Sequence, residues 1–77
     1  MNMDKKVYDL FSDIVLTYCN DESKNIVKVN TNNFNDDELK MIDSNILKKF
    51  KVYDDIYTIY RDTLDYYNYI VIEKVVF

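Results

Sequence analysis

The residue types that most often carry chemistry near neutral pH are almost absent from this chain. It contains no histidine, so the commonest general base is missing. Its single cysteine, Cys19, has no histidine to activate it. One cysteine without histidine also excludes a structural zinc site within one chain. We therefore predict a protein that is not an enzyme and that binds no metal ion or cofactor.

Acidic residues stand side by side in two places, at Asp36-Asp37 and at Asp54-Asp55. Adjacent side chains diverge on a helix or a strand, so neither pair makes a compact acid–base dyad by itself. We interpret Asp36 and Asp37, together with Glu38, as residues of a helix N-terminus, where negative charge is favourable.

Tyrosine is the most distinctive residue type, with eight copies in 77 residues. A small core cannot hold them all, because each buried hydroxyl needs a hydrogen-bond partner or water. Exposed tyrosine gives a large, rigid contact area, and nearby aspartates can pair with Arg or Lys of a partner. The predicted partner-binding residues are Tyr53, Asp54, Asp55, Tyr57, Tyr60, Asp62, Asp65, Tyr66, Tyr67 and Tyr69. AT-rich codon usage combined with β-propensity is an alternative explanation for the tyrosines.

Helical periodicity predicts the first element over residues 4–19, with Asp4 as N-cap and Asn20 as a left-handed C-terminal residue. A second helix begins after Asn35, whose spacing from Glu38 is that of a capping box. Its apolar stripe runs as far as Phe50, and a weak break is expected at residues 43–45. The two predicted stripes comprise Val7, Leu10, Phe11, Ile14, Val15 and Tyr18, then Leu39, Ile42, Ile46 and Phe50.

The remaining segments are rich in β-branched and aromatic residues. Residues 25–30 are predicted to form a short strand, and residues 56–77 a long hairpin with a polar connection at 62–65. The final strand shows no clearly polar face, which indicates a central position. The fold class is therefore α+β in the order α-β-α-β-β. Two helices pack on one face of a small, mainly antiparallel three-stranded sheet, with residues 52–53 as a candidate extra strand.

A winged-helix arrangement is the alternative fold. It requires a separate recognition helix over residues 45–51, carrying Lys48, Lys49 and Lys51, and a wing at residues 62–65. That wing would present Asp62 and Asp65, which repel phosphate, so we give this alternative less weight.

Length, charge and composition limit the class of protein. The 77 residues form a single domain, and the net charge of −4 argues against direct binding to nucleic acid or to an anionic membrane. No apolar run is long enough to span a membrane, and no secretory signal is recognisable. A lone cysteine indicates a reducing compartment, so we expect a cytoplasmic location in a host cell.

Three functions follow as predictions. The first is a small, acidic, non-enzymatic protein from a phage, mobile element or AT-rich virus that binds the basic surface of a larger host protein and inhibits it. In size and composition such a chain resembles small phage counter-defence proteins such as anti-CRISPR inhibitors. A separate expectation, from the acids of the first helix and of the hairpin, is a merged negative surface that imitates the phosphate backbone and occupies a basic nucleic-acid channel. The second is a homodimeric structural or assembly subunit, paired through an uncovered strand near residues 75–77. The third is a winged-helix regulator.

Overall fold

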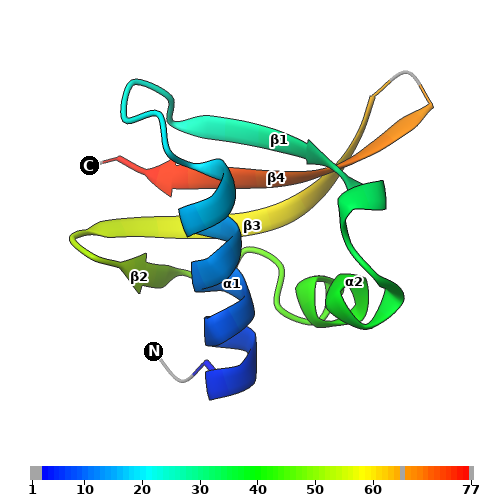
Figure 1. Ribbon diagram of the computed structural model, residues 1–77, viewed down its shortest axis with the longest axis horizontal. Helices are drawn as coiled ribbons and strands as arrows, with labels where there is room; N and C mark the ends of the chain where they lie inside the picture. Colours follow the sequence, from blue (N-terminus) through cyan, green and yellow to red (C-terminus); the bar gives the residue numbers. More distant parts are fainter. Residues whose placement is uncertain (1–2, 65, 77) are drawn as a thin grey trace.

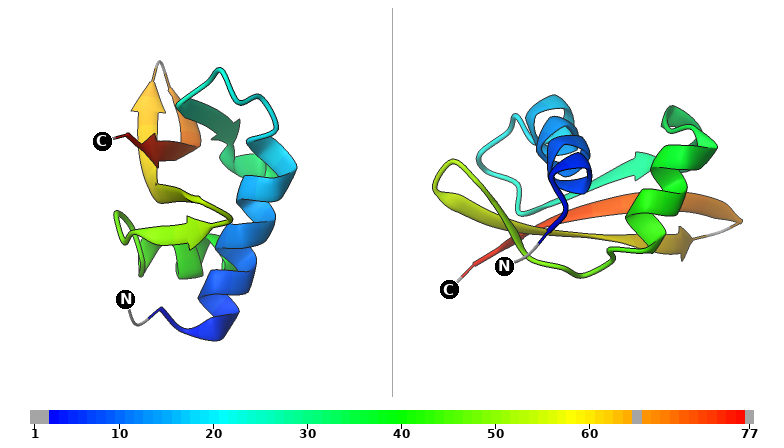
Figure 2. Two further views of the ribbon diagram at one scale, coloured as in Figure 1. Left: turned by 90° about the vertical axis from the view of Figure 1, so that its left-hand side faces the viewer. Right: turned by 90° about the horizontal axis from the view of Figure 1, so that it is seen from below.

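One antiparallel sheet organises the residues described by the computed structural model, which are 3–64 and 66–76. Within them the strands are β1 (Ile26–Asn30), β2 (Phe50–Val52), β3 (Asp55–Leu64) and β4 (Tyr67–Val75), in the spatial order β1-β4-β3-β2. The helices are α1 (Lys5–Tyr18), the 3-10 helix η1 (Thr31–Asn33) and α2 (Asp36–Asp43). Both α-helices lie on the same side of the sheet (Figure 1; Figure 2, right).

The α+β class is confirmed, but the predicted three-stranded sheet is wrong. The fourth strand is β2, which pairs with the start of β3 from Phe50 opposite Tyr57 to Val52 opposite Asp55. Phe50 was predicted to end a helix, and it is instead a fully buried strand residue. The order is therefore α-β-α-β-β-β, apart from η1.

The final hairpin is longer than predicted. Residues 62–64 belong to β3, and Leu64 pairs with Tyr67, so only residues 65–66 connect the two strands. The central position of the last strand is confirmed, because β4 lies between β1 and β3. The strand is paired on both sides from Tyr69 to Glu73, whereas Val75 has a partner on the β3 side only. The uncovered edge expected near residues 75–77 therefore stays a prediction. Val75 itself pairs with Ile56, and Phe77 lies outside the described residues.

Helix α1 confirms its predicted stripe: Val7, Phe11, Ile14 and Val15 are buried. Asp4 caps it by accepting a hydrogen bond from the Lys6 amide. The predicted left-handed residue at Asn20 is wrong, because the positive φ angles of the described residues occur at Leu47, Tyr53 and Tyr66.

Helix α2 begins as predicted and ends early. Asn35 and Glu38 form both hydrogen bonds of the capping box. At the other end the Asn45 side-chain amide donates to the Met41 carbonyl, satisfying a helix-end acceptor, and Ile46 is left exposed. Residues 44–47 form turns, and Lys48 and Lys49 lie in the irregular segment before β2, not in a helix. The winged-helix alternative is wrong for the same reason, because its recognition helix is absent from this described segment.

The capping box makes the Asn35→Ala variant a direct test of local helix stability. The variant leaves the Glu38 amide without its side-chain acceptor. We expect the free energy of unfolding to fall by about 1 kcal/mol, as for other N-cap truncations. Urea denaturation of both proteins measures the change, with Asn32→Ala, an exposed η1 residue, as the comparison. Equal stability of Asn35→Ala and the parent would contradict a structural role for the cap.

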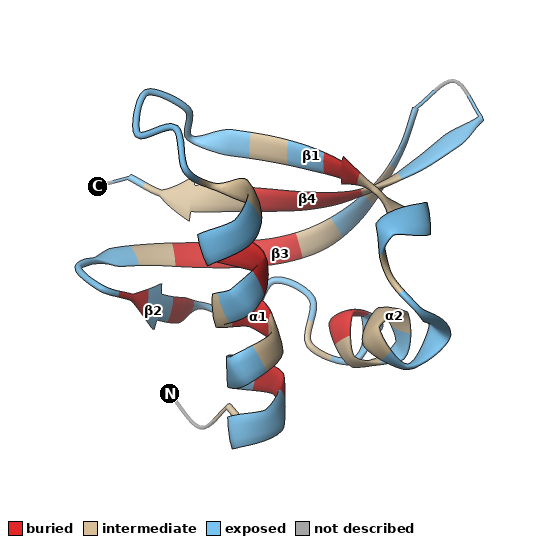
Figure 3. Ribbon diagram, viewed as in Figure 1, coloured by how far each residue is buried: buried red, intermediate tan, exposed pale blue. Residues whose placement is uncertain are grey.

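The core lies between the helices and one face of the sheet. Ile59, Ile70 and Ile72 are fully buried there, together with Phe11 of α1 and Ile42 of α2 (Figure 3). Burial does not alternate in the middle of β3 and β4: residues 57–59 and 70–72 are buried on both faces, as expected for central strands. The helix-covered face still holds almost all of the apolar packing.

On the opposite, open face of the sheet, the central residues are shielded from solvent by neighbouring side chains of the same face. Val71 and Thr58 are buried there although both helices lie on the other side. Tyr60 lies opposite Val71, and the Lys28 ammonium lies 3.5 Å from the Asp62 carboxylate. Burial, followed by the charge of Glu73, raises the pKa of Tyr60. The centre of this face is thus covered by polar side chains and offers little free apolar area.

Candidate interaction surfaces

The predicted Tyr/Asp surface divides into two groups at opposite ends of the sheet (Figure 1). Tyr53, Asp54 and Asp55 lie at the β2–β3 turn, and all three are exposed. The second group lies at the β3–β4 connection, and Asp65 of this group is outside the described residues. The ten residues therefore do not form one continuous contact surface.

Tyr57 does not belong to either exposed group. Its residue exposure is 7%, and its ring packs 6.0 Å from the ring of Phe50 on the helix-covered face. Tyr60 is half-buried on the open face. Packing within the protein accordingly accounts for the burial of both tyrosines.

The β3–β4 connection carries the largest exposed aromatic group of the described residues. We call Leu64, Tyr66, Tyr67 and Tyr69 the tip cluster. Tyr66 is 101% exposed, and Tyr67 and Leu64 are 59% and 53% exposed. The rings of Tyr67 and Tyr69 lie 6.5 Å apart between centroids and are tilted by 48°. Leu64 lies opposite Tyr67 on the same face of the sheet.

The hairpin holds the tip cluster away from the body of the protein. β1 pairs with β4 only as far as Tyr69, so the residues beyond have no third strand beside them. Thr63 and Asn68, on the other face of this extension, share a side-chain hydrogen bond of 3.2 Å. The extension projects past the helices in Figure 1. Its aromatic face is consequently available for contact.

The backbone of Tyr66 has an unfavourable conformation, and no packing of its side chain within the protein offsets that cost. Its φ is 72°, in the left-handed region that is unfavourable for bulky residues, and its side chain is fully exposed. Asparagine tolerates this region better, and this chain is rich in asparagine. Because Asn and Tyr codons are both AT-rich, codon bias does not explain why Tyr occupies this position.

Leu64 is the member of the tip cluster that the sequence did not predict. It was assigned to a polar connection because Asp62, Thr63 and Asp65 surround it. A two-residue period could have placed Leu64 in the strand, because every second residue from Ile56 lies on the open face. That row comprises Ile56, Thr58, Tyr60, Asp62 and Leu64.

No group of three or more potential metal ligands occurs among residues 3–64 and 66–76. Cys19 is half-buried at the end of α1, and burial raises the pKa of its thiol, with a smaller opposing effect from the Lys74 charge. A raised thiol pKa lowers the fraction of reactive thiolate at neutral pH.

Neither helix of the described chain is both long and apolar enough to cross a membrane. Comparison with known proteins gives no further guide: no family model, curated protein or solved structure matches this chain.

Proposed function

We propose that this chain is a small interaction protein that binds a larger protein through the tip cluster and thereby inhibits it. The observation that carries the proposal is the fully exposed Tyr66, held in a strained conformation at the end of a projecting hairpin. Tyrosine is enriched among residues that dominate binding energy, because it buries a large area at little entropic cost.

The flanking polar groups support a partner with basic residues. Asp62 lies at the root of the tip cluster, where its carboxylate is about half exposed. A partner Arg can share this carboxylate with Lys28, whose ammonium lies 3.5 Å away, and can stack on the ring of Tyr67 or Tyr69. The shared surface would then be aromatic in its centre and charged at its edge, as protein interfaces commonly are.

Imitation of a nucleic-acid backbone receives less support as the inhibitory mechanism. Four acids of the described chain, Asp9, Asp43, Asp55 and Asp62, each lie within ion-pair distance of a Lys or Arg. Paired carboxylates present a weaker negative field than a row of free ones. Aromatic anchoring is therefore the mechanism we favour.

Photo-crosslinking tests the proposed function. One variant carries p-benzoylphenylalanine at position 66, and a control carries it at position 47, where Leu47 is also exposed and left-handed. In lysate of a low-GC bacterium we expect position 66 to link one larger protein that position 47 does not, and the purified partner to lose activity with the parent chain. Equal products from both positions would contradict the tip cluster as the binding surface, and a product of two copies of the chain would favour self-association.

A further inference from the structure

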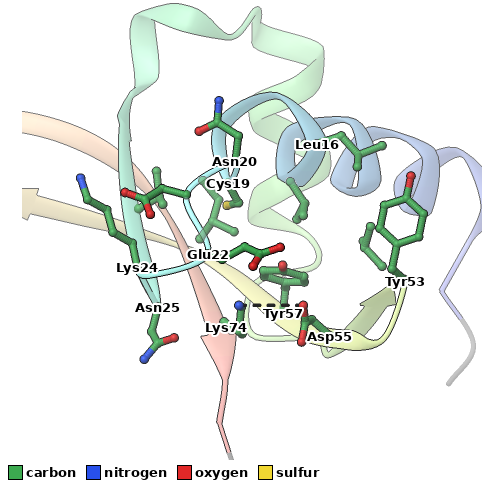
Figure 4. Close-up of a pocket in the computed structure, with 15 residues that line it drawn as sticks. Leu16, Cys19, Asn20, Glu22, Lys24, Asn25, Tyr53, Asp55, Tyr57 and Lys74 are labelled. Carbon is green, nitrogen blue, oxygen red and sulfur yellow. Dashed lines mark ion pairs between the residues drawn. The ribbon is translucent and has the colours of Figure 1, made fainter.

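A pocket of about 300 Å³ lies between the end of α1, the loop that follows α1, and the β2–β3 turn (Figure 4). The tip cluster is at the opposite end of the sheet, so this pocket is a separate feature. One side is apolar, with Leu16 of α1 and the exposed ring of Tyr53. The other side is polar, with Glu22, Asp55 and the Tyr57 hydroxyl.

The Tyr57 hydroxyl lies at this pocket (Figure 4), although more than nine-tenths of the residue is buried. Among the described residues it is not one of the buried polar atoms that lack a partner, so the hydroxyl itself is open to water or to a ligand in the pocket. Burial raises its pKa, and the nearby Asp55 and Glu22 carboxylates act in the same direction. The hydroxyl therefore stays protonated near neutral pH and is free to accept or donate a hydrogen bond in the pocket.

The charge of the pocket favours a cation. Asp21, Glu22 and Asp55 line it against Lys24 and Lys74. The Lys74 ammonium lies 3.9 Å from the Asp55 carboxylate, the longest ion pair in the described part of the chain. Glu22 makes no ion pair there, and Figure 4 shows its carboxylate turned toward Tyr57. An anionic ligand would meet this uncompensated carboxylate.

We propose that the pocket binds an arginine side chain of a protein or peptide. A guanidinium carries five N–H donors in one plane, so it can pair with Glu22 and Asp55 and also donate to the Tyr57 hydroxyl. Its methylene groups can lie along Leu16, and its flat face can stack on Tyr53. A lysine ammonium is a single, strongly hydrated point charge. It therefore matches the separate acceptors of Glu22, Asp55 and Tyr57 less well.

This inference goes beyond the proposed function, because it concerns another end of the molecule and its test requires no protein partner. The probe is N-acetyl-arginine amide, titrated into the ¹⁵N-labelled chain and followed by NMR. We expect saturable shifts at the amides of Glu22, Asp55 and Tyr57, with a dissociation constant on the order of millimolar for so small a ligand. N-acetyl-citrulline amide, which has the same shape without the charge, should produce only weak shifts.

Three variants complete the experiment. Glu22→Gln and Tyr57→Phe should each weaken arginine binding by about fivefold, as expected for one polar contact at a partly exposed site. Asp54→Asn is the matched control, since Asp54 is exposed in the same turn but does not line the pocket. Equal shifts with citrulline, an absence of saturation, or an equal loss in the Asp54→Asn variant would overturn the proposal.

Discussion

Phe11→Ala is expected to lower the free energy of unfolding by about 3–5 kcal/mol, a large part of the total. Phe11 is fully buried in α1, and its ring lies 5.3 Å from that of Phe50 in β2. Truncation of a buried phenylalanine costs about 3–5 kcal/mol, because apolar burial is lost and a cavity remains. A domain of this length has a total stability of roughly 4–12 kcal/mol, so most of a modest stability would be lost.

Circular dichroism with urea denaturation measures this effect. Leu16→Ala is the matched control, because Leu16 lies on the same helix and is 54% exposed. We expect the control to change the free energy of unfolding by less than about 1 kcal/mol. If Phe11→Ala and Leu16→Ala were equally stable, the helix would not pack on the sheet as described.

The Tyr66→Asn variant is expected to increase stability and to weaken partner binding at once. Asn tolerates the left-handed backbone better than Tyr, so relief of strain should stabilise the fold by roughly 1 kcal/mol. Loss of the exposed ring removes no internal packing, because Tyr66 is fully exposed. Truncation of a dominant interface tyrosine costs about 2 kcal/mol of binding energy, which is about 30-fold in affinity.

The opposite changes in stability and affinity distinguish three roles for Tyr66. If codon usage alone accounts for the tyrosine, its replacement should change the stability and leave the affinity unchanged. A residue that supports the fold would lose stability when replaced. Urea denaturation supplies the first quantity and calorimetric titration with the crosslinked partner supplies the second.

Patterns within short segments were the most reliable guide to this fold. The apolar stripe of α1 predicted its four buried residues, and the Asn35–Glu38 spacing predicted the capping box. Both depend on residues within one or two helical turns of each other, so neighbouring sequence contains the necessary information. The position of β4 inside the sheet was predicted for a similar reason, because both of its faces are partly apolar.

Features that depend on distant residues were missed. Ile46 and Phe50 continue a helical spacing, yet Asn45 ends the helix and Phe50 pairs with β3. The Leu47 amide is held by the Ile59 carbonyl at 2.9 Å, a contact that no local pattern reveals. With no glycine in the chain, the left-handed positions carried no recognisable residue type.

The candidate surfaces could be predicted only in part, because they too depend on residues that are distant in the sequence. The surplus of tyrosine indicated exposed rings, and Tyr53, Tyr66 and Tyr67 are exposed. Sequence could not separate these from Tyr57, because the face on which each side chain lies depends on strand register. The Glu22–Tyr57 pocket joins a loop to a strand far along the chain, and it became visible only in the folded structure.

The most direct test of the tip cluster compares the affinities of Tyr66→Asn and Leu47→Asn for the partner linked at position 66. Both substitutions place asparagine at a position where the backbone is left-handed and the native side chain is exposed. Both should therefore stabilise the fold. We predict that Tyr66→Asn loses about 30-fold in affinity while Leu47→Asn retains the affinity of the parent chain. Equal affinities of the two variants would contradict the tip cluster as the site of partner binding.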